Sequence, residues 1–127
     1  ARRQRQMCIR DRLKTGAMIA GACRLGVAAA GGGEDLMSAA GTYARELGLA
    51  FQIRDDMLDV CGDAAEFGKP IGSDQEEGKV TFVDLLGLEG CGRAVHARTE
   101  AAKAAVAACD RDGFLSALAD ALAERNK

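Results

Sequence analysis

The chain has 127 residues, enough for one domain, and 48% of them are hydrophobic; this share includes 25 Ala and only 30 Leu, Ile, Val, Met or Phe. Ala favours helices, and a chain with no Trp and a single Tyr is a poor match to an all-β sandwich or barrel. The net charge of −2 combines six Arg or Lys in residues 1–14 with eight acidic residues in 55–77, so a uniform nucleic-acid-binding surface is not expected.

The first half of the chain predicts two long helices. Residues 1–12 carry five Arg and little apolar periodicity, so they are either a basic arm or the frayed front of the next helix. Helical periodicity runs from Leu13 to Ala30, and the glycines at 31–33 end it. A second helix is expected over residues 34–61, with Glu34 and Asp35 in its first turn.

The second half begins with a loop, Gly62–Gly72, and predicts three further helices. Ser73 and Glu76 form a capping-box pattern ahead of a helix from Asp74 to about Leu86. Glycines in 87–92 break that helix, and an Ala-rich helix follows over 93–112 until Gly113 stops it. A final amphipathic helix starts at Phe114. The expected fold class is therefore all-α, with about five helices and no confident strand.

Several kinds of site and location are disfavoured. The longest apolar stretch, residues 17–30, is interrupted by Arg24 and two glycines, so no membrane span or secretory signal is expected. Five cysteines without a CxxC pattern argue against a disulfide scaffold or a zinc site, and a reducing, cytoplasmic location fits best. His96, the only His, stands in a charged helix without a partner pattern and is expected at the surface.

The segment over residues 51–59 carries the chemistry. At about 100° per residue, four polar side chains fall within an arc of roughly 100° on the second helix: Gln52, Asp55, Asp56 and Asp59. Like charges at this spacing repel each other, and burial adds to the cost. Such a stripe is stable when a divalent cation occupies it, and carboxylate oxygens suit Mg²⁺, which often shares phosphate oxygens with a substrate. The simpler alternative is a solvated acidic helix face.

Lysines near this stripe indicate an anionic ligand. Lys69 lies in the Gly-rich loop, Lys79 precedes Thr81 in the next segment, and Lys14-Thr15 opens the first helix. Lysines around a magnesium site supply the point charges that a diphosphate needs. Taken singly, each Lys is better explained as a solvated surface residue than as a ligand-binding one.

Four runs together resemble the polyprenyl diphosphate synthase family of type I isoprenoid synthases, most closely its bacterial farnesyl branch: 14–16 (KTG), 48–59 (GLAFQIRDDMLD), 68–74 (GKPIGSD) and 78–81 (GKVT). The ending Arg125-Asn126-Lys127 is also similar. The resemblance covers residues 13–127 and corresponds to the C-terminal portion of such a synthase domain.

The resemblance implies an all-α helical bundle, a homodimer, and condensation of isopentenyl diphosphate with an allylic diphosphate such as dimethylallyl or geranyl diphosphate. It implies Asp55 as the main Mg²⁺ ligand, Asp59 as a ligand through water, and Asp56 as a weaker one. It also implies that Lys14, Lys69 and Lys79 contact the allylic diphosphate, and that Thr15 and Gln52 line the same site. The implied product is a short-chain, farnesyl-type prenyl diphosphate.

Two departures from the family pattern are expected to matter. The family's first Asp-rich motif and its isopentenyl diphosphate site have no counterpart in these residues, so we expect the chain to be inactive alone. Residues 1–12 fit the family poorly: Cys8-Ile9-Arg10 stands where an Ile-His pair is usual. We interpret this basic leader, and Gln6–Arg12 in particular, as non-family sequence introduced by cloning.

Three alternatives stay open at this point. A longer-chain polyprenyl synthase would carry the same motifs, because chain length is controlled mainly beside the first Asp-rich motif. A non-catalytic subunit of such an enzyme would have no need for the intact set of Asp and Lys residues. A generic acidic Ca²⁺-binding helix would leave the lysines unexplained.

Overall fold

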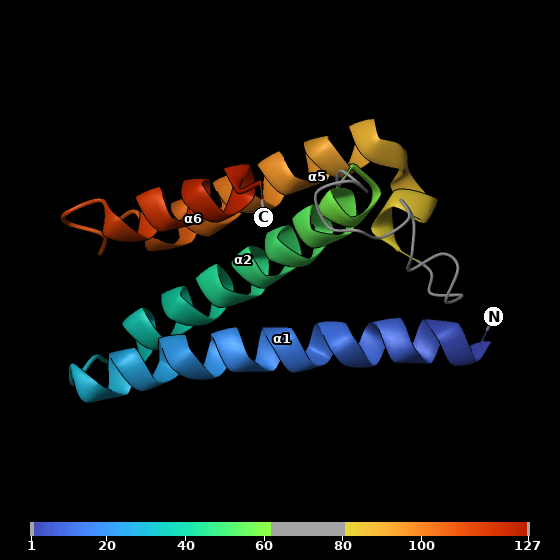
Figure 1. Cartoon of the computed structure of the whole chain (residues 1–127). Coiled ribbons are helices and arrows are strands. Elements are labelled where there is room, and N and C mark those ends of the chain that lie inside the picture. The colour runs from blue at the N-terminus through green and yellow to red at the C-terminus, as the bar shows by residue number, and fades with distance from the viewer. Residues whose placement is uncertain (1, 62–80, 127) are drawn as a thin grey trace.

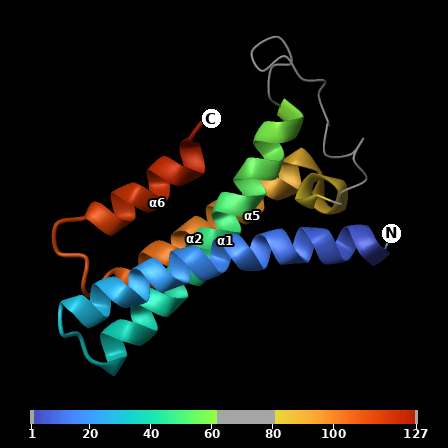
Figure 2. The same cartoon turned by 60° about the horizontal axis from the view of Figure 1, so that its bottom comes forward.

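The computed structural model describes residues 2–61 and 81–126, with side chains described for 15–60 and 81–126. These residues form four helices and no strand, which confirms the all-α prediction: α1 (Arg2–Ala29), α2 (Glu34–Cys61), α5 (Phe82–Val106) and α6 (Phe114–Glu124). Helix α2 forms the middle layer. Figure 1 shows it between α1 and the pair α5–α6, and in the turned view of Figure 2 α1 lies in front of it and α5 behind it.

The connection from α1 to α2 is as tight as the glycines at 31–33 predict. The amide of Gly32 donates to the carbonyl of Val27 at 2.9 Å, and the amide of Gly31 donates to that of Ala28 at 3.1 Å. This pair of bonds is a Schellman motif, which needs a left-handed residue, and Gly31 has φ 72°. A Cβ on Gly32 would lie only 2.6 Å from Leu36. The chain therefore reverses direction here, and a side chain at residue 32 would require Leu36 and Val27 to move.

Helix α1 begins at Arg2, so the basic start is the front of the first helix and not a separate arm. Two large apolar side chains one heptad apart on this helix, Met18 and Leu25, are 73% and 71% exposed. Spacing of seven places them on one side of the helix. The side of α1 turned away from α2 therefore presents apolar surface to solvent. No helix in the described ranges combines the length and apolarity that crossing a membrane requires.

Two apolar clusters hold α2 against its neighbours. The first surrounds Tyr43 and Leu47, which pack on Ala102 and Val106 of α5 and on Ala119 of α6. The second joins Ile53 of α2 to Cys91 and Val95 of α5. An ion pair between Arg98 and Glu46, at 2.8 Å, lies beside these clusters and also connects α5 to α2.

Helix α5 begins later than the sequence pattern predicts. Thr81 is not helical; it is the N-cap, and its hydroxyl accepts from the amide of Asp84 while the Asp84 carboxylate accepts from the amide of Thr81. This capping box is the physical reason that the predicted helix from Asp74 to Leu86 cannot run through residue 81. The predicted break after Leu86 is present as a kink at Gly87, whose φ of 72° and ψ of 167° suit only glycine. Ser73, Glu76 and the loop Gly62–Gly72 lie outside the described residues.

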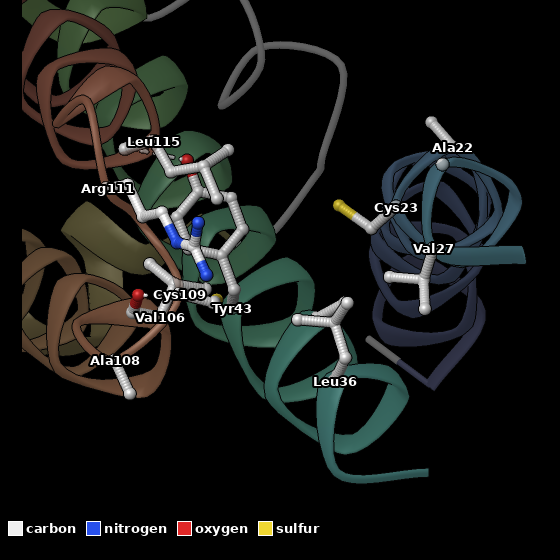
Figure 3. A pocket seen from close by; sticks show the side chains of 12 residues that line it. Ala22, Cys23, Val27, Leu36, Tyr43, Val106, Ala108, Cys109, Arg111 and Leu115 are labelled. Atoms are coloured by element: carbon white, nitrogen blue, oxygen red, sulfur yellow. Dashed lines mark hydrogen bonds between the residues drawn. The ribbon is translucent and has the colours of Figure 1, made fainter. Parts of the chain in front are cut away.

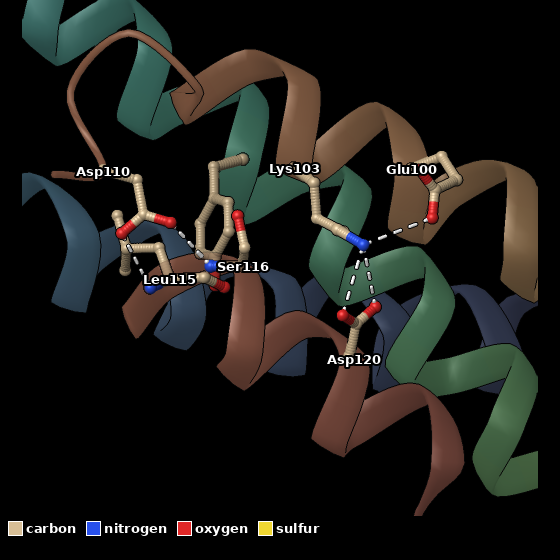
Figure 4. A network of polar contacts seen from close by, with 7 residues as sticks. Glu100, Lys103, Asp110, Leu115, Ser116 and Asp120 are labelled. Atoms are coloured by element: carbon tan, nitrogen blue, oxygen red, sulfur yellow. Dashed lines mark hydrogen bonds and ion pairs between the residues drawn. The ribbon is translucent and has the colours of Figure 1, made fainter. Parts of the chain in front are cut away.

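Helix α5 also ends earlier than predicted, at Val106 instead of residue 112. The cause is Asp110, whose carboxylate accepts from the amides of Leu115 at 3.0 Å and Ser116 at 2.9 Å, as Figure 4 shows. Burial acts to raise the pKa of Asp110, but these hydrogen bonds outweigh it, and the pKa is lowered. The Asp110 carboxylate thus caps the first turn of α6. The chain turns between the two helices through Gly113, whose φ is 75°.

Helix α6 is tied to α5 and α2 by polar contacts as well as by the core. Lys103 lies between Asp120, at 3.1 Å, and Glu100, at 3.4 Å (Figure 4). The hydrogen bond to Asp120 is the main cause that raises the pKa of Lys103. On the other side, the hydroxyl of Tyr43 donates to the carbonyl of Leu115 at 2.8 Å.

Tyr43 offers a direct measure of this packing, because it is the only Tyr in the chain. Its side chain is buried, and burial raises its pKa to about 12. An unfolded Tyr titrates near 10, so the unfolded chain loses this proton first as the pH rises. We expect the free energy of unfolding to fall between about pH 10 and 12, and tyrosinate absorbance to develop about two pH units later in the folded chain than in urea.

The control is Tyr43→Phe, which should lower the free energy of unfolding near neutral pH by about 1 kcal/mol through the lost hydrogen bond. It should also remove the Tyr-dependent part of the alkaline loss. A tyrosinate titration that is the same in folded and denatured chain would contradict the buried position.

Candidate functional site

The three carboxylates predicted as one stripe on α2 have different surroundings. The Asp55 side chain is 57% exposed, whereas Asp56 is 7% exposed and Asp59 is half-buried. Asp56 therefore faces a neighbouring helix and not the open surface. The sequence pattern did not separate Asp56 from the other two carboxylates, because the arc estimated from helix geometry takes no account of where α5 packs.

Asp56 holds the first turn of α5. Its Oδ2 atom accepts a hydrogen bond from the amide of Phe82 at 2.9 Å, directly after the N-cap Thr81. Amides in the first turn of a helix have no partner within the helix, and a carboxylate there also interacts favourably with the helix dipole. Burial raises the pKa of the nearby Cys91 thiol, and the negative charge of Asp56 adds to that effect. Asp56 thus links α2 to the start of α5.

Asp55 has a cationic neighbour from the end of the chain. The Nη2 atom of Arg125 lies 3.4 Å from Oδ1 of Asp55 and also donates to the carbonyl of Phe51 at 3.4 Å. The guanidinium carbon lies 4.2 Å from the centre of the Phe51 ring, in a cation–π contact. Nε of Arg54 in turn donates to the backbone carbonyl of Arg125 at 3.1 Å. One face of α2 therefore holds both the side chain and the backbone of Arg125.

The motif on α1 meets the acidic helix one turn before Gln52. A Cβ on Gly48 would lie 3.7 Å from Cα of Gly16 and 3.8 Å from Ile19, so α1 and α2 come into contact at these glycines. Thr15 precedes Gly16, and Gln52 follows Gly48 by four residues on the same face of α2. Both side chains are half-buried. The structure thus brings Thr15 to the helix that carries Gln52, Asp55 and Asp59.

The lysines predicted to bind a diphosphate are not placed by these contacts. Lys69 and Lys79 lie outside the described residues, and Lys14 is within α1 but its side chain is not described. Their roles stay predictions.

The number of protein ligands that Mg²⁺ needs decides whether these acidic residues could hold it. Among the side chains described, those of residues 15–60 and 81–126, no three His, Cys, Asp or Glu gather closely enough to hold a metal ion. Asp55 and Asp59, one helical turn apart, are on the same face of α2. Mg²⁺ usually binds one or two carboxylates and completes its shell with water and substrate phosphates. Two carboxylates fit that requirement, but they do not make a closed protein cage.

Away from these carboxylates, the part of the chain that the structure describes includes two cavities. An apolar one of about 570 Å³ opens near the turn between α1 and α2, where Cys23 and Val27 face Leu36 and Tyr43 (Figure 3). Tyr43 and Asp55 are twelve residues apart, about 18 Å along the helix axis. A smaller cavity of about 210 Å³ includes the exposed His96 among its lining residues. The first is lined mainly by apolar side chains, with Arg111 as its cationic group, and neither cavity includes Asp55.

Sequence reasoning missed the partners of the two adjacent carboxylates. Phe82 and Arg125 lie 26 and 70 residues away from Asp56 and Asp55 in the chain. The similarity of the last three residues to the family's ending was the one available signal for Arg125, and it did not indicate a contact with Asp55.

The different surroundings of the two carboxylates predict different effects on stability. Asp56→Asn should lower the free energy of unfolding by about 1–2 kcal/mol, because it weakens a buried cap of α5. Asp55→Asn is the matched control: its exposed ion pair should contribute less than about 1 kcal/mol. Urea unfolding followed by circular dichroism measures both. Equal destabilisation by the two changes would show that the Asp56 contact does not hold α5.

Comparison with known proteins relates these elements to a family. The family model described as polyprenyl synthetase matches residues 6–111. The farnesyl diphosphate synthase of Escherichia coli K12 is 43% identical over 122 residues, covering 91% of this chain and 40% of that protein. The farnesyl diphosphate synthase of Geobacillus stearothermophilus is 39% identical over 102 residues, covering 80% and 34%.

A geranylfarnesyl diphosphate synthase of Aeropyrum pernix is also similar, with 44% identity over 82 residues, covering 65% of this chain and 26% of that protein. The chain spans two fifths or less of the length of these three relatives. The extent of the family match, over more than half of the chain, shows that the chain belongs to the polyprenyl synthetase family.

Proposed function

We propose that this chain is the C-terminal part of a prenyltransferase that condenses isopentenyl diphosphate with an allylic diphosphate such as dimethylallyl or geranyl diphosphate. The observation that carries the proposal is the contact between α1 and α2 at Gly16 and Gly48, which brings Thr15 beside the helix of Asp55 and Asp59. The relatives support it, because their names describe prenyl diphosphate synthases. A farnesyl-type product, a homodimer and a cytoplasmic location are parts of the same proposal.

In this proposal Asp55 and Asp59 hold Mg²⁺. Asp56 contributes less to metal binding because it already accepts a hydrogen bond from the amide of Phe82. Mg²⁺, when bound, supplies positive charge that stabilises the departing diphosphate. Lys14, Lys69 and Lys79 bind the same diphosphate as point charges, while Thr15 and Gln52 line its site and orient it. These groups together make departure of the leaving group easier because its charge is stabilised as it develops.

The reaction then follows from the chemistry of the substrates. Departure of diphosphate leaves an allylic carbocation, the alkene of isopentenyl diphosphate attacks it to form the new carbon–carbon bond, and loss of a proton restores an alkene. The half-buried apolar residues that flank Asp55 and Asp59, Phe51 and Leu58 on one side and Val60 on the other, would help to keep water from the cation.

The chain alone is expected to have no synthase activity, because it carries only one of the two Asp-rich motifs of its family. Incubation of the purified chain with isopentenyl and geranyl diphosphates and Mg²⁺, followed by chromatography of the products, tests this. Steady turnover by the isolated chain would show that the first Asp-rich motif is not required.

The role of Asp55 is tested in the E. coli relative with its aligned segment replaced by residues 13–127 of this chain. Asp55→Ala should lower kcat on the order of a hundredfold, comparable to the loss of one strong electrostatic stabiliser. Asp56→Ala should cost less once stability is accounted for. Asp35→Ala, an exposed acid about 30 Å along the same helix, is the matched control and should leave kcat unchanged. Full activity with Asp55→Ala would refute the proposed metal site.

A further inference from the structure

Arg125 is the one residue that contacts the exposed acid of the site from outside α2 in the part of the chain that the structure describes. Its guanidinium touches Asp55 and Phe51, and its backbone carbonyl is held by Arg54. These three partners are spaced i, i+3 and i+4, so they present one continuous face of α2.

The position of Arg125 is set by the fold and not by a loose tail. It is the C-cap residue of α6, and its side chain is only 18% exposed, compared with 57% for Asp55. The start of α6 is fixed to α2 by the hydrogen bond between Tyr43 and Leu115. The guanidinium is therefore held next to Asp55 before any ligand arrives.

A fixed guanidinium has opposite effects on the two proposed ligands of this site. Arg keeps its positive charge at all relevant pH values. Next to Asp55 it repels a second cation and competes with it for the carboxylate. When a diphosphate is present, the same positive charge attracts the anion, and a planar guanidinium can donate two hydrogen bonds to phosphate oxygens.

We propose that Arg125 makes divalent-cation binding at Asp55 depend on the diphosphate: it weakens binding of the cation alone and strengthens binding of the cation together with the anion. The inference rests on the proposed function, because it takes Asp55 as a metal ligand. It adds a positioning residue from the C-terminal end of the chain, which suppresses occupation of the site by metal without substrate.

The experiment measures two affinities of the 127-residue chain. Binding of Mn²⁺ alone, as a spectroscopic substitute for Mg²⁺, is followed by electron paramagnetic resonance. Binding of radiolabelled inorganic diphosphate in excess Mn²⁺ is followed by equilibrium dialysis. Arg125→Gln should bind Mn²⁺ about three- to tenfold more tightly and should bind the diphosphate with Mn²⁺ more weakly by a similar factor, as loss of a partly exposed charge predicts.

The two affinities should change in opposite directions, and this distinguishes the proposed role from a structural one. Loss of structure would weaken binding of both Mn²⁺ alone and diphosphate with Mn²⁺. Arg125→Met keeps the stem over Phe51 without the charge and should behave like Arg125→Gln, with folding of each variant checked by circular dichroism. Arg125→Lys keeps the charge but not the planar guanidinium, so its affinity for Mn²⁺ alone should stay near the wild-type value, and its diphosphate affinity should fall between those of wild type and Arg125→Gln. Arg45→Gln removes an exposed positive charge from α2 about 15 Å along the axis, beyond the Debye length of about 10 Å at 0.1 M salt, and should change neither affinity.

Asp55→Asn separates failure of the inference from failure of the proposed function. If Asp55→Asn removes Mn²⁺ binding but the folded Arg125→Gln and Arg125→Met variants bind Mn²⁺ no more tightly than wild type, the role of Arg125 is overturned and the metal site stands. If Asp55→Asn leaves Mn²⁺ binding unchanged, the proposed metal site itself is wrong, and the inference is overturned with it.

Discussion

Helix α2 must bury apolar side chains against other helices and yet keep three carboxylates charged within five residues. Charges at this spacing repel each other, and removing any of them from water adds to the cost. The structure meets this constraint with a different partner at each of two adjacent positions. Asp56 turns inward and caps the first turn of α5, whereas Asp55 stays in solvent beside Arg125. These two contacts join the apolar clusters in placing α5 and α6 around the C-terminal half of α2.

Small residues make that arrangement possible. Ala44 and Ala50 of α2, Ala102 of α5 and Ala119 of α6 are all nearly inaccessible to solvent. Helices with such residues at their contacts approach closely, and at Gly16 and Gly48 the approach is close enough that backbone meets backbone. The high Ala content of the sequence is therefore more than a helix preference. At the contact between α1 and α2 it is the glycines at 16 and 48 that let the motif on α1 come close to the acidic face of α2.

Local signals in the sequence were enough to predict the elements but not all of their ends. Helix α2 has the predicted bounds, 34–61, and α6 starts at the predicted Phe114, because acidic first-turn residues and glycines act within a few residues. The predicted ends of α5 were misplaced because the side chains of Asp84 and Asp110 accept hydrogen bonds from backbone amides near these ends. Apolar periodicity carries no information about such hydrogen bonds.

The candidate site shows the same limit more clearly. The sequence predicted which residues of α2 bear the charges, because helix periodicity is local. It could not predict which carboxylate would be covered, because that depends on where Phe82 and Arg125 pack, and these residues lie 26 and 70 positions away from Asp56 and Asp55 along the chain. The inward position of Asp56 and the neighbour of Asp55 are therefore properties of the tertiary structure.

Helix α6 gives the site its remaining rigidity, because it is fastened to α2 near both of its ends. Near its start, Tyr43 donates to the carbonyl of Leu115, and just past its end Arg54 donates to that of Arg125. Between these points Lys103 of α5 contacts Asp120. A rigid helix of 11 residues fixed in this way cannot shift along α2 without breaking hydrogen bonds at both ends. The distance between the Arg125 guanidinium and Asp55 is thus set partly by the core around Tyr43, about 18 Å away along α2. The packing around Tyr43 and the position of the Arg125 charge are therefore coupled through α6.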